Sequence, residues 1–385
     1  MIRRQTVTAL KALWTAGVLG AVAVAPLIAG AVDLAEPIER LLNSRSAGSP
    51  RAYAEAAEAV ADAAKRGRPL QQYIIALISR DADAPPAARI SPATRERYLA
   101  ESRVAIHRLA EERNNPLAWY LLSVESSDTN LLRRAADGNN VQALNAWGTS
   151  LLDRALNAPT VDEAGIQAAV DCFRRAAGQG DANGLYNLGM AYARGLDMAR
   201  DDTQAFACFR SAAEKGHPEA INSLGWFFRE GRVFSKDLEL AAKWFEKAAS
   251  YGNPYGQFNW GLALQRGEGV KADAARAVEQ LRRAAEGGCI EAMTAYGVSL
   301  ARGDGVKADA PGAVVWFRKA AAAGYPPAME NLAECYARGR GVPEDNREAL
   351  VWKFRSRAAR GDRAAADWLR QNAPPEKQDA PSEKE

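Results

Sequence analysis

Residues 292–324 read AMTAYGVSLARGDGVKADAPGAVVWFRKAAAAG, and this stretch decides the fold because its pattern returns every 36 residues. Small residues, glycines and aspartates recur at that interval along the later part of the chain. An interval of this size indicates a stacked array of like units, each burying its apolar side against its neighbours. The three columns are Gly184, Ala220, Gly256, Ala292 and Ala328; Gly195, Gly231, Gly267, Gly303 and Gly339; and Asp201, Asp237, Asp273, Asp309 and Asp345.

Each unit carries the signals of two helices, which we call helix A and helix B. In the quoted stretch we expect helix A over residues 290–302, ending at Gly303, because glycine adopts the left-handed conformation without strain. Asp309 is expected to cap helix B by accepting from its free N–H groups, and Pro311 suits the first turn, where no donor is needed. No run of residues alternates with a period of two, so we predict no strands.

A separate targeting segment is expected over residues 1–31. Three basic residues, the last of them Lys11, give it a positive start, and residues 12–32 carry no charge. Ala-Gly-Ala at 29–31 fits the small-x-small rule of signal-peptide cleavage. An uncleaved membrane anchor is the alternative, since about 20 apolar residues can span a bilayer. Both interpretations keep the body of the chain outside the cytoplasm, so we expect a periplasmic or secreted protein, or one anchored by an N-terminal transmembrane helix.

Three parts follow the targeting segment. Residues 32–137 predict helical hairpins without the clean repeat, with helix starts signalled by pairs such as Ser91-Pro92. Residues 138–371 hold the repeats, about six in number. Residues 372–385 are rich in proline and charge, which is typical of a disordered tail.

The balance of charge excludes one class of partner. The chain has 385 residues and a formal charge of +3, from 50 Lys+Arg against 47 Asp+Glu. The excess lies in the targeting segment, so the remainder of the chain is neutral. A neutral chain has no broad field to attract nucleic acid or acidic lipid. We therefore expect no nucleic-acid partner, and membrane contact only through the targeting segment if it stays uncleaved.

The residues that usually carry chemistry are scarce. His107 and His217 are the only histidines, and neither has a base or nucleophile partner at a recognisable spacing. No His/Cys spacing suggests zinc. The Gly-x-Gly segments lack the lysine of a phosphate-binding loop and do not follow a strand, so they indicate turns. We predict a non-catalytic protein without a metal or cofactor.

The four cysteines are expected to be thiols. Cys172 and Cys208 lie one period apart and so occupy equivalent sites on adjacent units. Stacked units are about 10 Å apart, whereas a disulfide needs Cα atoms within roughly 7 Å. We therefore expect this pair to be unbridged, and buried free thiols in general. The sequence leaves the separation of Cys289 and Cys335 open.

One face of helix A is the candidate binding surface. In the unit that begins at Gly184, Asn187 and Arg194 share this face at i and i+7. Asparagine can pair with a peptide backbone through both amide ends, and Trp226 and Phe227 would supply apolar anchors of the kind that dominate interfaces. Two alternatives stay open: Trp226 packs between units, and the arginines balance the dipole at the end of helix A. The candidate residues are Asn187, Arg194, Ser223, Trp226, Phe227, Asn259, Arg266, Arg302, Asn331 and Arg338.

The pattern resembles the Sel-one-like repeat family, a relative of the tetratricopeptide repeats. The family motif appears in residues 187–189 (Asn-Leu-Gly), 303–306 (Gly-Asp-Gly-Val) and 316–321 (Trp-Phe-Arg-Lys-Ala-Ala). The match covers roughly residues 138–371 and recurs five or six times. The turn at 231–234 (Gly-Arg-Val-Phe) departs from the motif.

This resemblance implies an all-α, right-handed solenoid of antiparallel helix hairpins, with helix A lining the concave surface. It also implies a scaffold, adaptor or regulator of protein complexes, in the cell envelope for exported members. One alternative is a carbohydrate-binding scaffold in polysaccharide export. Another is a cell-wall or β-lactam-active enzyme, although the chain contains no Ser-x-x-Lys. We therefore expect a protein or peptide partner in the envelope, bound through the concave helix-A surface, with polysaccharide as the alternative partner.

Overall fold

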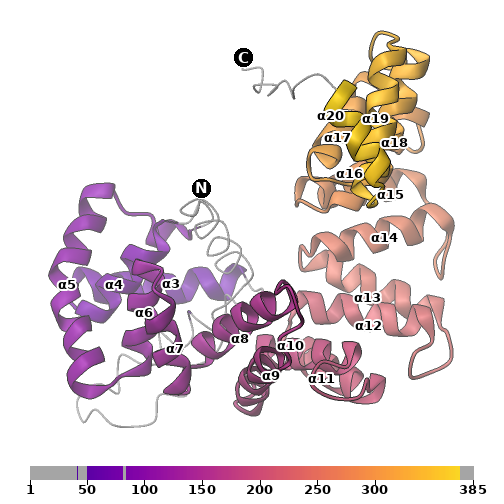
Figure 1. The fold of residues 1–385 in the computed structure, drawn as a ribbon. Coiled ribbons are helices and arrows are strands. Elements are labelled where there is room, and N and C mark those ends of the chain that lie inside the picture. Colours follow the sequence, from indigo (N-terminus) through magenta and orange to yellow (C-terminus); the bar gives the residue numbers. More distant parts are fainter. Residues whose placement is uncertain (1–40, 42–49, 81–83, 373–385) are drawn as a thin grey trace. The chain divides into compact units, whose positions relative to one another are not determined.

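The computed structural model describes residues 41, 50–80 and 84–372 of the chain. Within these ranges the fold is all-α, with eighteen α-helices, one short 3-10 helix and no strand (Figure 1). The predicted fold class, a solenoid of helix hairpins, is confirmed. The targeting segment expected at 1–31 and the tail after residue 372 lie outside the described residues.

The chain divides into two compact units, Met1–Lys236 and Asp237–Glu385, and each is described by itself. The first unit opens with helices that do not repeat, and they begin where the sequence predicts. The Ser91 hydroxyl accepts from Thr94 N–H at 3.1 Å, and the Asn115 side chain accepts from Ala118 N–H at 3.0 Å. The elements are α3 (Pro50–Lys65), α4 (Pro69–Ile78), η1 (Pro86–Ala88), α5 (Pro92–Arg113), α6 (Pro116–Ser126) and α7 (Thr129–Asp137).

The expected boundary at residue 138 does not coincide with a break in the core. One apolar cluster joins α3–α7 to the first hairpin of the repeats, because Leu144 and Ala176 belong to the same buried group as Tyr73. Tyr73 is fully buried, and its hydroxyl donates to Glu125, which also accepts from Arg103. Burial raises the pKa of the Tyr73 hydroxyl, so it stays a donor to the carboxylate. The non-repeating helices therefore cover the open end of the array.

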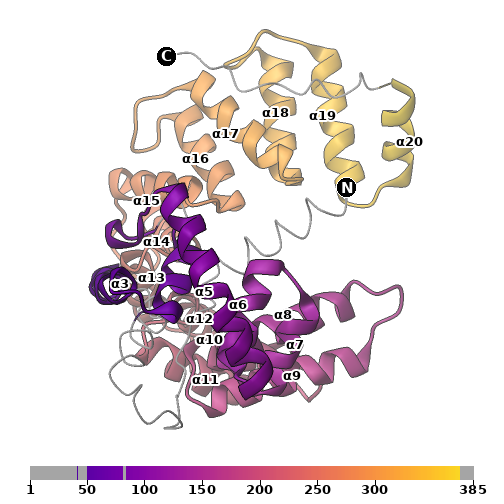
Figure 2. The same ribbon diagram turned by 90° about the vertical axis from the view of Figure 1, so that its left-hand side faces the viewer.

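The repeats continue the first unit and make up the second. Helices α10 to α18 have 13 residues each, whereas α8 and α9 have 16, so the stretched first repeat lengthens both of its helices. In the second unit, α16 to α20 form successive antiparallel neighbours (Figure 2). The first unit holds α8 (Val141–Leu156), α9 (Glu163–Gly178), α10 (Ala182–Arg194), α11 (Asp202–Glu214) and α12 (Pro218–Glu230). The second holds α13 (Leu238–Ser250), α14 (Pro254–Arg266), α15 (Ala274–Glu286), α16 (Ile290–Arg302), α17 (Ala310–Ala322), α18 (Pro326–Arg338), α19 (Asn346–Ala359) and α20 (Arg363–Asn372).

The predicted residues at the end of helix A and the start of helix B are confirmed. Helix A ends at Gly303, whose φ of +79° is the left-handed conformation that glycine tolerates. Helix B begins at Asp309, whose carboxylate accepts from Gly312 N–H at 2.9 Å. The other aspartates of that column cap their helices in the same way. Each cap satisfies a donor that would otherwise be orphaned and stabilises its helix by about 1 kcal/mol.

One large apolar side chain from helix B fills the centre of each hairpin that lies within one unit. Phe317 is 2% exposed and lies against Gly297 of helix A, where an added Cβ would come within 2.6 Å of its ring. Phe209 packs on Gly189 in the same manner. The helices therefore approach closely because the ring faces a residue without a side chain. The equivalent positions of helix B are all buried, namely Phe173, Phe209, Phe245, Leu281 and Phe317.

The cysteines are free thiols, as expected. Three are buried, and Cys208 is half-buried. Burial raises the pKa of Cys172 to about 11 and that of Cys289 to about 12, which keeps both sulfurs protonated and unreactive at neutral pH. Among the described residues, none of the helices is sufficiently long and hydrophobic to traverse a lipid bilayer.

Candidate functional site

The candidate residues of helix A differ in exposure. Trp226 is 39% exposed on α12, and the Arg229 guanidinium carbon lies 4.8 Å from the centroid of its ring. Asn187, Ser223 and Asn331 are half-buried. The exposed arginines are Arg194, Arg266, Arg302 and Arg338. Among these candidate positions, the C-terminal end of helix A is therefore the most exposed part of this face.

Phe227 and Asn259 are core residues. Phe227 is 3% exposed and Asn259 is 4% exposed, so neither side chain faces solvent. The position of Phe227 is buried in every described repeat because helix A packs against the helix B that precedes it, as α12 does against α11. The sequence assigned Phe227 to the open face, but its position turns toward a neighbouring helix. Phe227 is thus a core ring against Phe209, at 5.7 Å between centroids, and not an exposed anchor.

The asparagines of the face are engaged within the protein. Asn331 donates from its side chain to Pro327 O at 3.0 Å, and Asn187 donates to Asn145 Oδ1 at 3.5 Å. Ser223 likewise donates to Glu219 O at 2.9 Å. These bonds link one turn of helix A to the next or one repeat to its neighbour. This face therefore does not present a row of side-chain amides for pairing with a peptide backbone.

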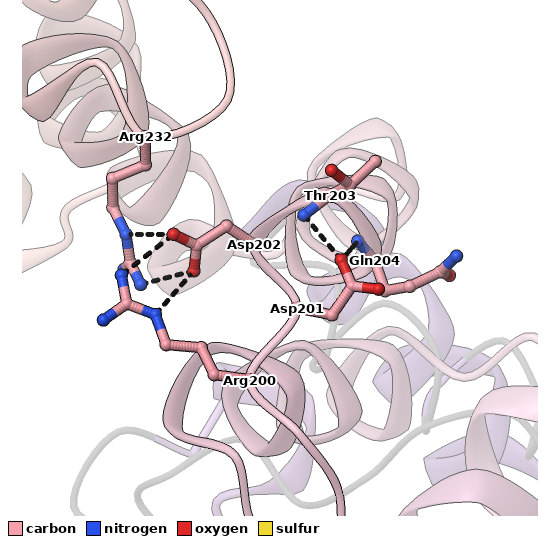
Figure 3. A network of polar contacts seen from close by, with 6 residues as sticks. All are labelled: Arg200, Asp201, Asp202, Thr203, Gln204 and Arg232. Atoms are coloured by element: carbon pink, nitrogen blue, oxygen red, sulfur yellow. Dashed lines mark hydrogen bonds and ion pairs between the residues drawn. The ribbon is translucent and has the colours of Figure 1, made fainter.

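A second arrangement, which the sequence did not reveal, lies in the first unit at the start of α11 (Figure 3). Asp202 accepts from Arg200 Nε at 3.1 Å and from Arg232 Nε at 3.0 Å, so one carboxylate joins two guanidinium groups. The hydrogen bonds from Arg200 and Arg232 hold the pKa of Asp202 below its usual value. The neighbouring Asp201 caps α11 by accepting from Thr203 N–H at 2.9 Å.

This ion-pair network replaces a backbone contact found in the regular repeats. In those, the second glycine of Gly-x-Gly lies against the preceding helix B: a Cβ on Gly305 would come within 2.1 Å of Ala274 O. The equivalent of Gly305 in the degenerate turn is Val233, whose side chain prevents such an approach. The adjacent Arg232 reaches the equivalent of Ala274, which is Asp202, through its side chain instead. The departure at Val233 was the signal in the sequence.

The degenerate turn also exposes an aromatic ring. Phe234 is 49% exposed and packs its edge on Phe206, with centroids 5.1 Å apart. Phe228 of α12 lies parallel to Phe234 at 5.8 Å. The regular repeats place the smaller Val270, or its equivalents, at this position. The first unit therefore carries a local aromatic cluster that the other repeats lack.

A family model for the Sel1 repeat matches residues 162–181, 182–217, 218–253, 254–289, 290–325 and 326–352. The chain is a Sel1 repeat protein. The matched segments of the regular repeats begin with helix A and end after helix B, as the structure has them. The resemblance inferred from the motifs is confirmed.

Solved structures are similar to this Sel1 repeat protein. A Sel1 repeat protein from Oxalobacter formigenes is 25% identical, with a TM-score of 0.50 over 66% of this chain and 95% of that one. The protective antigen c5321 of uropathogenic Escherichia coli, described as displaying an SLR fold, is 21% identical, with a TM-score of 0.41 over 89% and 86%. The immunity protein Pa5087 from Pseudomonas aeruginosa is 16% identical, with a TM-score of 0.40 over 60% and 88%. No curated protein matches the sequence.

The N-caps of helix A vary between Sel1 repeats, and His217 is one of them. Its Nδ1 accepts from Ala220 N–H at 3.3 Å, and its Nε2 lies 3.1 Å from Asn183 Oδ1. The ring stacks on Tyr186 at 4.7 Å between centroids. Burial lowers the pKa of His217 to about 4, so the ring is neutral and capping explains its position. His107, by contrast, lies exposed on α5.

The described residues include no group of three or more His, Cys, Asp or Glu side chains that could hold a metal ion. One hollow of about 570 Å³ lies in the second unit between α13 and the turn at 267–271. It is lined by paired charges, among them Lys243 and Glu239 at 2.7 Å, and by Trp260. The side chains that line this hollow do not include a nucleophile beside a base.

Proposed function

We propose that this Sel1 repeat protein is a non-catalytic interaction scaffold and that a protein partner binds the exposed part of helix A in the first unit. Sel1 repeats generally mediate protein–protein interactions, and the repeats here match that family model. The observation that carries the proposal is the exposure of Trp226. Its side chain is 39% exposed, whereas core aromatics such as Phe209 are buried.

Trp226 has the properties of an interface anchor. A tryptophan ring offers a large apolar area at low entropic cost, and such residues supply most of the binding energy of many interfaces. Arg229 lies over one face of the ring, which limits its motion before binding. A partner that covers the rest of the ring would therefore gain buried apolar area without first ordering the side chain.

We further propose that the protein is exported and acts on a complex of the cell envelope. The support is the basic start, uncharged stretch and Ala-Gly-Ala site at the N-terminus. The test is to express the full chain with a C-terminal tag, fractionate the cells and sequence the N-terminus of the product. A product beginning at Val32 in the periplasm is expected, and an uncut cytoplasmic chain would contradict export.

The scaffold proposal is tested with the full chain as bait against envelope proteins, followed by affinity measurement with the purified partner. Trp226→Ala is expected to weaken the partner at least about tenfold, as loss of an anchor does. The matched control is Tyr255→Ala, which removes a ring that is 52% exposed on α14. Unchanged affinity of the Trp226 variant, at unchanged helicity, would refute this site.

A further inference from the structure

The hairpin formed by α19 and α20 is the most basic part of the second unit. Residues 346–372 hold seven basic and three acidic side chains, whereas residues 237–345 hold 13 basic and 14 acidic ones. The excess positive charge of the described second unit is therefore concentrated in this hairpin. Its basic residues are Arg347, Lys353, Arg355, Arg357, Arg360, Arg363 and Arg370, and its acidic residues are Glu348, Asp362 and Asp367.

Ion pairs leave part of this charge unbalanced. Asp362 and Asp367 each pair with an arginine of the same hairpin. Arg360 pairs with Glu330 of the preceding helix α18 at 2.6 Å. Three exposed cations remain whose side chains form no ion pair with any residue that the structure describes. They are Arg347, Lys353 and Arg363.

The helix dipoles do not explain the position of two of these cations. The start of a helix carries partial positive charge, so a cation there is unfavourable, whereas a cation near the end is favourable. Arg347 is the second residue of α19, and Arg363 is the first residue of α20. Solubility does not explain the excess either, because the polar outer face that a terminal hairpin needs can carry both signs of charge. The unpaired cations therefore favour an acidic occupant.

An acidic segment follows this hairpin directly in the sequence. Residues 373–385, which lie outside the described residues, hold four acidic side chains and two lysines. Their net charge is therefore opposite in sign to that of the hairpin. The segment is joined to Asn372, the last residue of α20. Its acidic residues are Glu376, Asp379, Glu383 and Glu385.

The point of attachment brings this segment within reach of the unpaired cations. Because α19 and α20 are antiparallel neighbours, α20 ends beside the start of α19, where Arg347 lies (Figure 2). The 14 residues of α19 make a helix about 21 Å long, whereas 13 extended residues span about 43 Å. A segment tethered at Asn372 has a high effective concentration at the hairpin, so weak, exposed contacts suffice to hold it.

We propose that the acidic segment 373–385 binds the basic hairpin α19–α20 of its own chain and thereby closes this surface to other acidic segments. Carboxylates of the segment contact Arg347, Lys353 and Arg363. The interaction does not depend on the proposed binding surface at Trp226, which lies in the first unit. Loss of one interaction therefore leaves the other intact, and each is tested by itself.

The contact is tested in the full chain with a carbodiimide, which joins a carboxylate to an amine without a spacer. Lys353 is the only lysine within residues 346–372, so its cross-links report on this hairpin. We expect cross-links from Lys353 to residues 373–385 at low salt, their loss at high salt, and fewer from the exposed Lys271 and Lys307. A mixture of isotopically light and heavy chains separates cross-links within a chain from those between copies. No cross-link at Lys353, or cross-links between copies only, would overturn the proposal.

The second measurement is the binding of a synthetic peptide of residues 373–385 to the full chain, followed by fluorescence anisotropy. The variant E376Q/D379N/E383Q/E385Q leaves the hairpin open, so it should bind the peptide at least about fivefold more tightly than wild type. Adding R347Q/K353Q/R363Q should abolish this gain. The matched control K271Q/R302Q/K307Q, which removes three exposed cations of the same unit, should retain it. Equal binding by wild type and the acid-to-amide variant, or equal losses from the two triple variants, would overturn the proposal.

Discussion

Replacing His217 by asparagine should remove a specific acid sensitivity of the first unit. The neutral ring caps α12 through Nδ1, so protonation destroys the acceptor that Ala220 N–H uses. Asparagine serves the same purpose one repeat later, where Asn253 accepts from Gly256 N–H at 2.7 Å. His217→Asn therefore keeps the cap and deletes the titration.

The magnitude follows from the pKa of His217, which burial lowers from 6.5 to about 4. A difference of one pKa unit corresponds to about 1.4 kcal/mol, so the full effect is about 3 kcal/mol. Because the folded pKa is depressed, this stability is present above pH 6.5 and is lost as the pH falls toward 4. Glu219 lies 3.3 Å from Nδ1 and opposes part of the loss, but it is 49% exposed and well screened.

The assay is urea unfolding followed by circular dichroism between pH 8 and pH 4.5. The free energy of unfolding of wild type should fall more steeply below pH 6.5 than that of the variant. His107→Asn, at an exposed position, should track wild type. Parallel curves for wild type and the His217 variant would refute the reasoning, as would an NMR titration that gives His217 an ordinary pKa.

Other predictions concern the turns and caps. Gly305→Ala should lower the melting temperature by several degrees more than Gly324→Ala: both have positive φ, but only at Gly305 would the Cβ meet backbone, 2.1 Å from a carbonyl oxygen. Equal shifts by calorimetry would remove the close contact as the cause. Asp181→Asn should raise the free energy of unfolding at pH 7, because burial raises the pKa of this carboxyl; the gain should shrink as wild type protonates at lower pH. A loss at pH 7 would count against it. Asp202→Asn should cost about 1 kcal/mol at pH 7, and the difference should fade as the pH drops through the carboxyl range, because the pKa is lowered. A double-mutant cycle with Arg232 that shows no coupling would contradict this.

The hairpins were predictable because local rules act together there. Gly303 ends helix A and Asp309 caps the start of helix B, and the structure places both where the sequence predicts. The non-repeating helices were found from capping pairs alone, as at Ser91 before α5. What the local rules do not contain is the sharing of one core across residue 138, because that depends on contacts between distant segments.

The candidate surface was less predictable because exposure is a tertiary property. The spacing of helix A placed Phe227 beside Trp226 on one face, yet Phe227 is buried against Phe209 of the preceding helix α11. The arginines are exposed, as the sequence predicts, at the last residue of helix A. The network at Asp202 joins residues 30 positions apart, so only the missing glycine at 233 hinted at it.

The two ways of joining successive hairpins have a consequence for how such a chain can grow or shrink. Gly269, Gly305 and Gly341 each meet a main-chain carbonyl, and every residue supplies one. A 36-residue cassette such as 290–325 should therefore be duplicated or deleted without redesign of its neighbours. The junction that uses Arg232 requires an aspartate, Asp202, at the start of helix B in the preceding hairpin. That repeat is tied to its place in the order, whereas the turns of those after it impose no such side-chain requirement.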